Sequence, residues 1–539
     1  MSFPIAPRVL TGVTMFIDSR SLPDQEVIEV DLCIAGAGAA GITIAREFIG
    51  RDLRVCLLES GGLEHDEETQ DLARGEVIGL PYFPLELAQC RYFGGTTNTW
   101  SGLCRPLDEI DFEVRDWVPH SGWPFTRSHL EPYYARARSI LQLGPLGDDS
   151  DAWEGEGAKR WPLSDKRVKT TIFQFSPPTR FGEVYRDEFR RASTIRVFLY
   201  ANVTEIETDD AAGTVSGLRV ATLAGNEFRV SARCFVLAMG GLEIPRLLLL
   251  SNKRRSAGLG NTHDLVGRFF MEHPHLESGA ILPSDPGIDI GFYDRHRVNG
   301  VVAFGALAIA DEILRRDRML NFSASLAFTV GDRYEAARRS EGASSLRYLY
   351  RDFRYSRLPR DFWHHLAAVI ADIDEVAIDL YGEAFGEVLP IFGLYNRTEQ
   401  APDPDSRITL STDKDRLGLN RVRLLWRLSA FDRQSIQRAH EIIGRELGRS
   451  GLGRLRIDIE DTDTGWPESL KGGGHLMGTT RMHADPRKGV VDAQCRVHGI
   501  SNLYISGPSV FPTGGYANPM LTIVALALRL ADHLKRVMS

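Results

Sequence analysis

A histidine set among glycines near the C-terminus is the residue whose type and setting best suit proton transfer. His475 lies in the run Gly472-Gly473-Gly474-His475-Leu476-Met477-Gly478. The glycines let the backbone approach a flat or bulky group, and a histidine at the rim of such a loop titrates near neutrality and can accept a proton. A histidine satisfied by structural hydrogen bonds is the alternative. His483 and His498 are rival bases, but neither has the glycine setting.

Asn518 is the second candidate for contact with a reacting group. It precedes Pro519 and Met520 at the expected start of a closing helix over Leu521–Leu534. An asparagine at a helix start holds its side chain at a fixed cap position. The residue could therefore present its amide to a ligand or serve only as a helix cap, and both interpretations stay open.

A glycine fingerprint near the N-terminus indicates a binding site for an adenine dinucleotide. An apolar strand from Val30 runs into Gly36-Ala37-Gly38-Ala39-Ala40-Gly41, and a helix is expected through Phe48. The first glycine permits the tight turn, the second lets a pyrophosphate approach the backbone, and the third lets the helix pack close to the strand. A second strand, Val55–Glu59, ends in an acid where the ribose hydroxyls should be bound, and Ser60 follows. A chance glycine cluster would not bring strand, helix, strand and acid in this order.

A second glycine-rich stretch is expected to meet the same ligand. It reads Arg91-Tyr92-Phe93-Gly94-Gly95-Thr96-Thr97-Asn98-Thr99-Trp100-Ser101-Gly102, and supplies backbone donors and short polar side chains around a planar group. A surface turn is the alternative, but exposed turns rarely carry tryptophan and phenylalanine. Further along, the strand Cys234–Met239, Gly240-Gly241 and a helix from Ile244 form another strand–glycine–helix unit, as if the chain returned to the same parallel sheet.

The chain length and this pattern predict an α/β fold with two domains, because 539 residues exceed one simple core. We expect a Rossmann-like nucleotide-binding domain with a central parallel sheet and an α+β substrate domain with a mostly antiparallel sheet. Strand-like runs and a hairpin signal at Arg407–Ser411 and Arg421–Leu428 would form the wall of the substrate pocket. The first domain is assigned to residues 1–145, 195–280 and 466–539, and the second to residues 146–194 and 281–465.

The composition of the chain indicates which binding partners and which cellular compartment to expect. The net charge of −8 gives no general attraction to nucleic acid, so the Arg- and Tyr-rich block 334–365 favours a solvated helical surface. Six scattered cysteines without C-x-x-C spacing, three of them in apolar strand patterns (Cys33, Cys56 and Cys234), predict core residues rather than a disulfide frame or a metal site. No signal peptide or membrane-spanning run is recognised, so a cytoplasmic enzyme without a membrane partner is expected, and it could be a homo-oligomer.

These motifs together resemble the glucose–methanol–choline (GMC) family of FAD-dependent oxidoreductases. The resemblance is strongest to the branch of pyranose oxidases, fructose dehydrogenase flavin subunits and sugar or glycoside 3-oxidases. The central block matches only in outline, through Ser406–Ser429. The matching segments are Gly36–Gly41 with Glu59, Gly94–Gly102, Ala201–Glu205, Ala238–Leu250 and His475–Ile523.

The resemblance implies an FAD enzyme that oxidises a CH–OH group of a sugar or glycoside to the keto sugar, by hydride transfer to flavin N5. His475 would be the base and Asn518 its partner. Electrons would pass to dioxygen or a quinone-like acceptor. The residues implied in cofactor binding are Gly36, Gly38, Ala39, Ala40, Gly41, Glu59, Ser60, Arg91, Gly94, Gly95, Thr96, Asn98, Thr99, Trp100, Ser101, Val203 (through its backbone), Ala238, Gly507, Pro519 and Met520.

Two departures and several alternatives accompany this resemblance. Thr99 stands where pyranose oxidases with a covalent flavin have a histidine, so noncovalent FAD is implied. The acidic residue that many members carry near Ser506-Gly507 is absent, which leaves the local flavin contact open. Oxidation of an amino-sugar primary alcohol or a sterol, a non-redox lyase, and a flavin-holding scaffold without turnover are the alternative functions.

Overall fold

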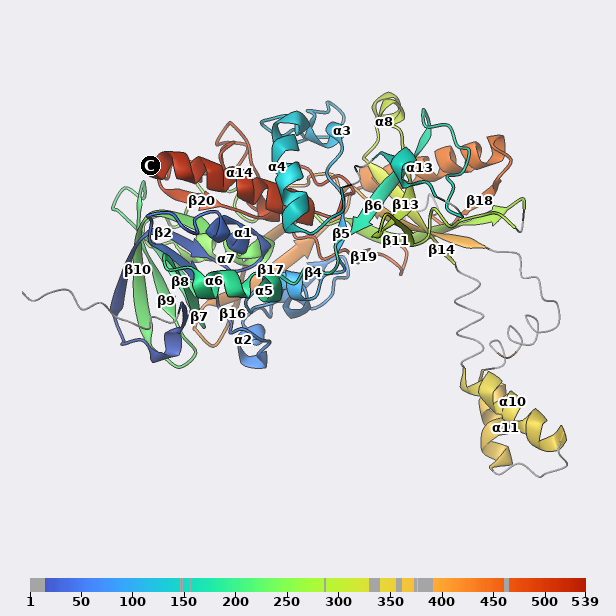
Figure 1. Cartoon of the computed structure of the whole chain (residues 1–539), viewed down its shortest axis with the longest axis horizontal. Coiled ribbons are helices and arrows are strands. Elements are labelled where there is room, and N and C mark those ends of the chain that lie inside the picture. The colour runs from blue at the N-terminus through green and yellow to red at the C-terminus, as the bar shows by residue number, and fades with distance from the viewer. Residues whose placement is uncertain are drawn as a thin grey trace, which may run out of the picture.

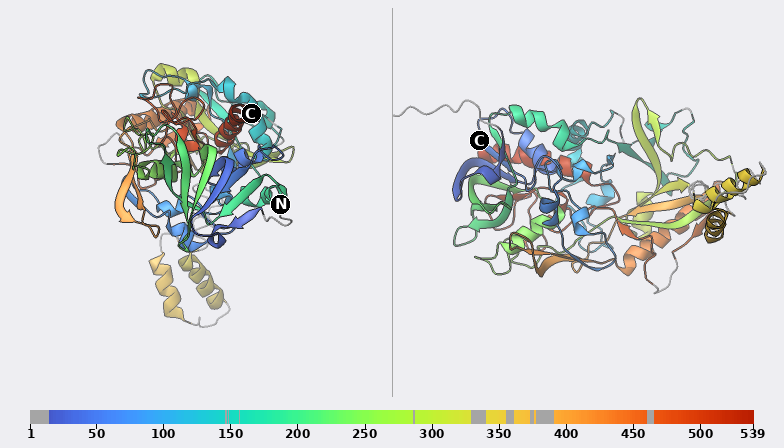
Figure 2. Two further views of the ribbon diagram at one scale, coloured as in Figure 1. Left: turned by 90° about the vertical axis from the view of Figure 1, so that its left-hand side faces the viewer. Right: turned by 90° about the horizontal axis from the view of Figure 1, so that it is seen from below.

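The computed structural model describes residues 15–145, 147, 149–155, 157–285, 287–328, 340–354, 361–372, 376, 391–459 and 465–539. Two large sheets lie side by side along the long axis of the molecule (Figure 1), and the chain crosses between them several times. Helices cover both sheets, and Figure 2 shows the same arrangement from one end and from below. The predicted class, a mostly parallel α/β sheet beside an antiparallel one, is confirmed. The residue limits of the two domains stay a proposal.

The first sheet contains the nucleotide-binding motif and is parallel over most of its width. Within the described residues it has eight strands, and only the pairs β10–β9 and β9–β8 are antiparallel. Its central strand has Leu32, Cys33, Ile34 and Ala35 fully buried, as expected for a parallel strand covered on both faces. In spatial order the strands are β1 (Phe16–Asp18), β7 (Ile195–Leu199), β3 (Val55–Leu58), β2 (Glu26–Ala35), β10 (Glu227–Leu237), β9 (Val215–Ala221) and β8 (Asn202–Thr208), with β20 (Leu503–Ile505) beside β10.

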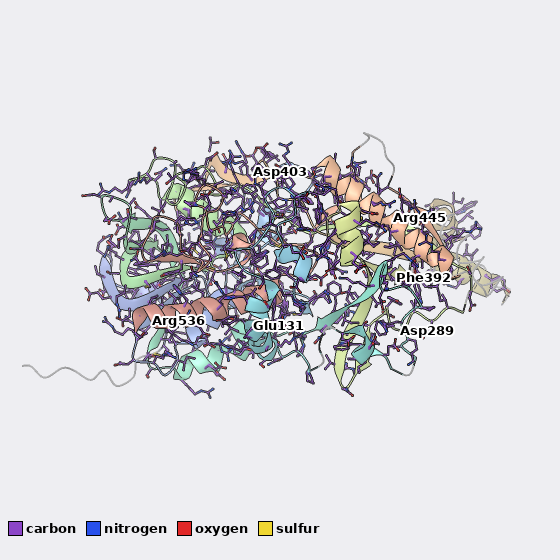
Figure 3. All side chains as sticks on the ribbon, turned by 90° about the horizontal axis from the view of Figure 1, so that it is seen from above. Glu131, Asp289, Phe392, Asp403, Arg445 and Arg536 are labelled. Atoms are coloured by element: carbon purple, nitrogen blue, oxygen red, sulfur yellow. The ribbon has the colours of Figure 1, made fainter. Side chains whose placement is uncertain are left out.

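Two long helices close one face of this sheet. α14 (Met520–Met538) packs against both α1 (Ala39–Arg46) and α4 (Arg127–Ile140), and its first two turns are almost wholly buried. Figure 3, viewed from above, places Glu131 of α4 and Arg536 of α14 over this half of the molecule. Among the helices of the described residues, none combines the length and the apolar character that crossing a bilayer requires.

The second sheet is antiparallel throughout and is covered by one long helix. Its described part has nine strands. α13 (Ala430–Arg449) begins at a capping box formed by Ser429 and Asp432 and buries Ile436, Ile443 and Leu447 against the sheet. The path is β18 (Gly453–Ile457), β11 (Pro274–Pro283), β15 (Phe392–Thr398), β14 (Phe322–Phe328), β13 (Val301–Ile309), β6 (Val168–Phe175) and β5 (Leu103–Cys104), with β12 (His296–Val298) on β13 and β19 (Lys471–Gly472) on β11.

Smaller elements complete the fold. The predicted hairpin is present as β16 (Arg407–Lys414) and β17 (Asn420–Trp426), and β4 (Glu76–Gly79) adds a parallel third strand. Of the block 334–365, residues 334–339 and 355–360 lie outside the described residues, and the rest belongs to a helical hairpin that stands apart from both sheets (Figure 1). The other helices are α2 (Glu67–Asp71), α3 (Glu109–Phe112), α5 (Phe181–Val184), α6 (Arg186–Arg191), α7 (Gly240–Leu250), α8 (Asp311–Asp317), α10 (Glu341–Arg354) and α11 (Phe362–Ala371).

A fully buried ion pair joins the segment after α3 to the end of β15. Both oxygens of Glu399 accept bonds from Arg115, at 2.5 and 2.8 Å, and the backbone N–H of Asn321 donates to the same carboxylate at 2.9 Å. Both charged side chains have no exposed surface. Removing one partner would leave the other charge buried and unpaired, which is much more costly than losing an exposed ion pair.

We therefore expect Glu399→Ala to lower the free energy of unfolding by about 3–5 kcal/mol. The matched control is Asp116→Ala, which removes the partner of Arg318 in an ion pair whose side chains are 58% and 74% exposed. That change should cost less than about 1 kcal/mol. Denaturant unfolding of the two variants measures both values, and equal destabilisation would contradict the prediction.

Candidate active site

The turn between β2 and α1 needs glycine for three different reasons. Gly36 has φ of +102°, and a Cβ there would lie 2.6 Å from the Ala238 carbonyl oxygen. A Cβ on Gly41 would lie 1.9 Å from the carbonyl oxygen of Gly36, so the helix can pack here only without a side chain. Gly38 is different, because a Cβ there would meet only the Gly95 Cα, at 4.0 Å, and would point into open space. That open side is where the fingerprint predicts a phosphate.

Glu59 lies at the end of β3 beside this turn. Its carboxylate accepts bonds from the backbone N–H groups of Ala37, at 2.9 Å, and Gly61, at 3.1 Å. Burial raises its pKa, whereas these two N–H groups and the nearby Arg91 lower it. Oε1 accepts a further bond from the Ser60 hydroxyl at 3.3 Å, whereas Oε2 keeps a lone pair and can still accept a bond from a ribose hydroxyl.

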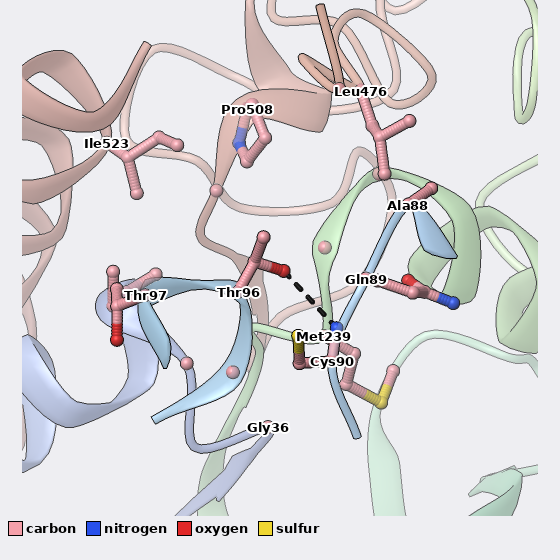
Figure 4. A pocket seen from close by; sticks show the side chains of 18 of the residues that line it. Gly36, Ala88, Gln89, Cys90, Thr96, Thr97, Met239, Leu476, Pro508 and Ile523 are labelled. Carbon is pink, nitrogen blue, oxygen red and sulfur yellow. Dashed lines mark hydrogen bonds between the residues drawn. The ribbon is translucent and has the colours of Figure 1, made fainter. Parts of the chain in front are cut away.

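The second glycine-rich stretch lines a cavity and is not an exposed turn. A Cβ on Gly95 would lie 2.9 Å from the Gly38 Cα, so the two glycine loops approach each other at this point. Asn98 donates a bond to the Phe93 carbonyl at 3.0 Å and closes the loop on itself. The Thr96 hydroxyl accepts a bond from the Cys90 N–H at 3.4 Å (Figure 4). The stretch thus has residues that shape the loop and residues that face the cavity.

One cavity of about 590 Å³ joins almost all predicted site residues. Figure 4 shows Gly36 and Thr96, near the start of the chain, around the same space as Pro508 and Ile523 near its end. Three predicted cofactor residues, Gly41, Gly94 and Asn98, do not line it; they shape the two loops instead. The predicted residues that line it are Gly36, Gly38, Ala39, Ala40, Glu59, Ser60, Arg91, Gly95, Thr96, Thr99, Trp100, Ser101, Val203, Ala238, His475, Gly507, Asn518, Pro519 and Met520.

The chemical end of the cavity holds His475 between Asn518 and a second histidine. Asn518 Nδ2 lies 3.2 Å from His475 Nε2, and His475 Nδ1 lies 2.7 Å from His273 Nδ1. His273 Nε2 lies 3.2 Å from the Gly514 carbonyl, which can only accept, so we assign the proton of His273 to Nε2. Its Nδ1 then accepts, the Nδ1–H of His475 donates to it, and His475 Nε2 carries no proton.

The electrostatics agree with a neutral imidazole. Burial, followed by His273, His275 and Arg397, holds the pKa of His475 well below its usual range. Burial likewise lowers the pKa of His273 to about 4. His475 Nε2 therefore carries an unprotonated lone pair at neutral pH. It faces the Asn518 amide at 3.2 Å and can accept a proton from a hydroxyl group that replaces this contact.

Asn518 is not a helix cap in the structure. The N-cap of α14 is Pro519, without a side-chain cap bond. The Asn518 side chain turns to His475 instead, and its Oδ1 is buried without a hydrogen-bond partner. A buried amide oxygen in this position is free to bind a ligand, so the cap-only interpretation of Asn518 is wrong.

A buried carboxylate fixes the histidine loop. Glu272 accepts bonds from the backbone N–H groups of Gly473, His475 and His273, at 3.0–3.1 Å, and from the hydroxyl of Tyr82. Burial raises the pKa of Glu272 to about 7, although these donors lower it. The carboxylate thus holds both histidine backbones at once and sets the position of the His475 ring.

We expect Glu272→Gln to destabilise the protein by about 1–3 kcal/mol, because the amide NH₂ cannot accept and leaves a buried N–H without a partner. The matched control is Tyr82→Phe, which removes one donor and should cost about 0.5–1.5 kcal/mol. Thermal unfolding measures both. A Glu272→Gln variant as stable as the Tyr82→Phe variant would show that the backbone bonds to this carboxylate do not hold the loop.

Several site residues were missed in the sequence. His273, His275 and Arg397 reach the site from the second sheet, and none belongs to a recognised motif. The run Glu272-His273-Pro274-His275 did carry a signal, since two histidines and an acid lie together where a strand begins. The rivals His483 and His498 do not line the cavity; His483 accepts a bond from the Asp485 N–H, and the ring of His498 bonds the His483 carbonyl.

The residues present fit a bound FAD on three structural grounds. Gly38 is an open glycine beside the helix start, where a Cβ would occupy cavity space. Glu59 keeps acceptor capacity at the end of β3. The cavity runs from these residues to the Asn518 amide oxygen, which has no partner. A dinucleotide that spans the cavity would thus meet complementary groups at both ends.

Comparisons with known proteins agree with this site. The GMC oxidoreductase family profile matches residues 402–527, and an FAD dependent oxidoreductase profile matches residues 31–258. The fructose dehydrogenase large subunit of Gluconobacter japonicus is 24% identical over 94% of this chain and 98% of its own. The 6'''-hydroxyparomomycin C oxidase of Streptomyces lividus is 26% identical over 94% and 92%. Formate oxidase of Aspergillus oryzae shares the fold, with a TM-score of 0.52 and 16% identity over 96% and 99% of the two chains.

The cavity with its glycine turn, the neutral histidine at its end and the two matched profiles point in the same direction. They identify a GMC-type FAD-dependent oxidoreductase that acts on alcohols.

Proposed function

We propose that the protein oxidises a CH–OH group of a sugar or glycoside to the keto sugar, with His475 as the base, as a member of the pyranose oxidase, fructose dehydrogenase and glycoside 3-oxidase branch. The observation that carries the proposal is the chain of contacts from His475 through His273 to the Gly514 carbonyl, from which an unprotonated Nε2 of His475 is assigned. Proton removal from an alcohol requires an acceptor of this kind at this end of the cavity.

The residues of the chain perform the proton transfer. The substrate hydroxyl donates to His475 Nε2, and Asn518 Nδ2, which is next to that nitrogen, donates to the substrate oxygen. Loss of the hydroxyl proton makes the carbinol carbon a better hydride donor, and a positioned base gives about 10²–10⁴-fold. FAD, when bound, supplies the two-electron acceptor for that hydride.

We propose that FAD is held without a covalent bond. Thr99 lines the cavity where relatives with a tethered flavin have a histidine, and the threonine hydroxyl offers no comparable attachment. Glu59 would bind the ribose hydroxyls, the backbone at Gly38 would approach the pyrophosphate, and Val203 would hold the adenine end through its backbone. Release of the flavin on denaturation in acid would support this; yellow colour retained in the precipitate would oppose it.

A sugar is favoured over a sterol by the character of the wall around His475. The cavity is lined here by His275, Arg397 and the glycines 472–474. These residues offer hydrogen-bond donors and backbone groups that no side chain covers, rather than an apolar face. One relative whose name states a sugar, the fructose dehydrogenase large subunit, aligns over nearly the full chain. The electron acceptor would be dioxygen or a quinone-like compound.

Anaerobic bleaching of the bound flavin by a panel of alcohols tests the proposal. Sugars and glycosides should bleach it, and sterols, amino sugars and simple alcohols should do so far more slowly. Admission of air with peroxide detection then separates an oxidase from a dehydrogenase, and product analysis locates the keto group. Bleaching by sterols alone, or by no alcohol, would overturn the sugar assignment.

A further inference from the structure

Arg397 occupies a central position in the substrate end of the cavity. It lies on β15 directly opposite His275 of β11, and Lys471 of β19 is the partner of His275 on the other side. Residues directly opposite in antiparallel strands project from the same face of a sheet. Arg397, His275 and Lys471 therefore form one row across three strands, and the first two line the cavity that contains His475.

The guanidinium of Arg397 is held firmly but lacks a counter-charge. Its Nη1 donates to the Ser325 hydroxyl at 3.2 Å, and the rings of Tyr395, Phe173 and Phe304 lie 5.3–5.8 Å from its central carbon. Among the residues that the structure describes, no carboxylate forms an ion pair with it. Burial lowers its pKa, and Tyr395 is the neighbour within the described residues that opposes this effect.

Three other buried arginines of the chain have a carboxylate partner. Arg105, Arg115 and Arg246 each pair with a carboxylate at 2.5–2.6 Å. Arg481 and Arg529 also lack one in the described part of the chain, but neither lines the cavity. Because a desolvated charge is costly unless it is paired, an unpaired arginine facing a ligand cavity indicates that the ligand supplies the partner.

The groups around Arg397 add positive charge and no free negative charge. Lys471 is exposed at the rim, with its Nζ 5.5 Å from the Tyr395 ring. Of the nearby acids, Glu399 is paired with Arg115, and Glu272 accepts bonds from the histidine loop. Neither of these acids forms an ion pair with the Arg397 guanidinium. No Arg397 nitrogen is among the buried polar atoms without a partner in the described residues, and the residue lines the cavity.

We infer that the substrate is an alcohol that also carries a carboxylate, such as a uronic acid or its glycoside, and that Arg397 binds this carboxylate while the carbinol lies at His475 and Asn518. The planar guanidinium matches a planar carboxylate through paired N–H donors. This inference rests on the proposed sugar oxidation and narrows it. It also separates this chain from enzymes of cationic amino sugars, which Arg397 and Lys471 would repel.

Paired substrates test the charge directly: methyl glucoside, methyl glucuronide and methyl 6-amino-6-deoxyglucoside differ only at one carbon. The wild-type protein should show kcat/KM for flavin reduction about 10- to 100-fold higher with the glucuronide than with the glucoside, and lowest with the amine. Arg397→Gln should abolish this preference, with a loss at least tenfold larger for the glucuronide than for the glucoside. Arg454→Gln, an exposed arginine on β18, is the matched control and should keep the preference.

A wild-type preference for the neutral glycoside would overturn the inference. So would an equal loss with both substrates in Arg397→Gln, which would mean that Arg397 acts on the alcohol oxygen. Methyl glucoside 6-phosphate preferred over the glucuronide would likewise exclude a carboxylate. If no sugar bleaches the flavin, the proposed function fails by itself. Calorimetry with tetrahydropyran-2-carboxylate then decides: binding lost in Arg397→Gln supports the anion site, and no binding to the wild type overturns it.

Discussion

His475→Ala is expected to keep FAD bound while its reduction by an alcohol slows by about 10²–10⁴-fold. The variant removes the Nε2 lone pair beside Asn518, and alanine fits the space without touching the glycine turn at the other end of the cavity. Stopped-flow absorbance of the anaerobic protein measures the reduction rate, and the flavin spectrum measures the cofactor content. His483→Ala, the rival histidine outside the cavity, is the control and should reduce at the wild-type rate.

The pH dependence provides a second readout of the same group. Burial and the neighbouring His273, His275 and Arg397 depress the pKa of His475, so the rate in the wild type should fall only at a pH well below 6.5. The folded state also loses stability as pH falls below 6.5, because both histidines bind protons more readily in the unfolded chain. In the folded state the pKa of His475 lies well below its usual range, and that of His273 is about 4. An acid limb at or above neutral pH would contradict the neutral imidazole. Full-speed reduction in His475→Ala would remove the base assignment altogether.

Local motifs made the nucleotide end of the site predictable. The turn at Gly36, the helix that follows it and Glu59 are close in sequence, and their spacing reflects constraints that act within one strand–helix–strand unit. The same holds for the start of α14 at Met520. The cap of this helix shows the limit of such reasoning, because whether Asn518 caps it or turns to a ligand depends on His475, which comes from a separate loop.

The substrate end could not be read from local patterns. His275 and Arg397 are separated by 122 positions, and they meet only because β11 and β15 pair in one register. A shift by one residue would turn each side chain to the other face, and nothing in either strand alone fixes that register. An acid beside two histidines marks the segment of Glu272, but the three backbone N–H groups that its carboxylate accepts from have no sequence signature.

Alanine substitutions at two glycines of the first turn should separate effects on cofactor binding from effects on folding stability. Gly38→Ala is expected to weaken FAD binding at least tenfold, about 1.4 kcal/mol, because the new Cβ would occupy the open side where the pyrophosphate approaches. The stability of the protein stripped of flavin should change by less than about 1 kcal/mol, since Gly38 has φ of −82°, which alanine adopts without strain, and its nearest neighbour is 4.0 Å away.

Gly36→Ala should instead destabilise the flavin-free protein itself. Its φ of +102° is unfavourable for alanine, and the Cβ would lie within 3 Å of three backbone atoms at Ala238 and Met239, so we expect a loss of about 2–5 kcal/mol in the flavin-free protein. Denaturant unfolding of the two flavin-free variants, with flavin titration of each, measures both effects. A Gly38→Ala protein that binds FAD normally would place the pyrophosphate elsewhere in the cavity. If both variants instead lose the same stability, the space beside Gly38 is filled in solution. The dinucleotide could then not approach the start of the helix, as the turn geometry requires.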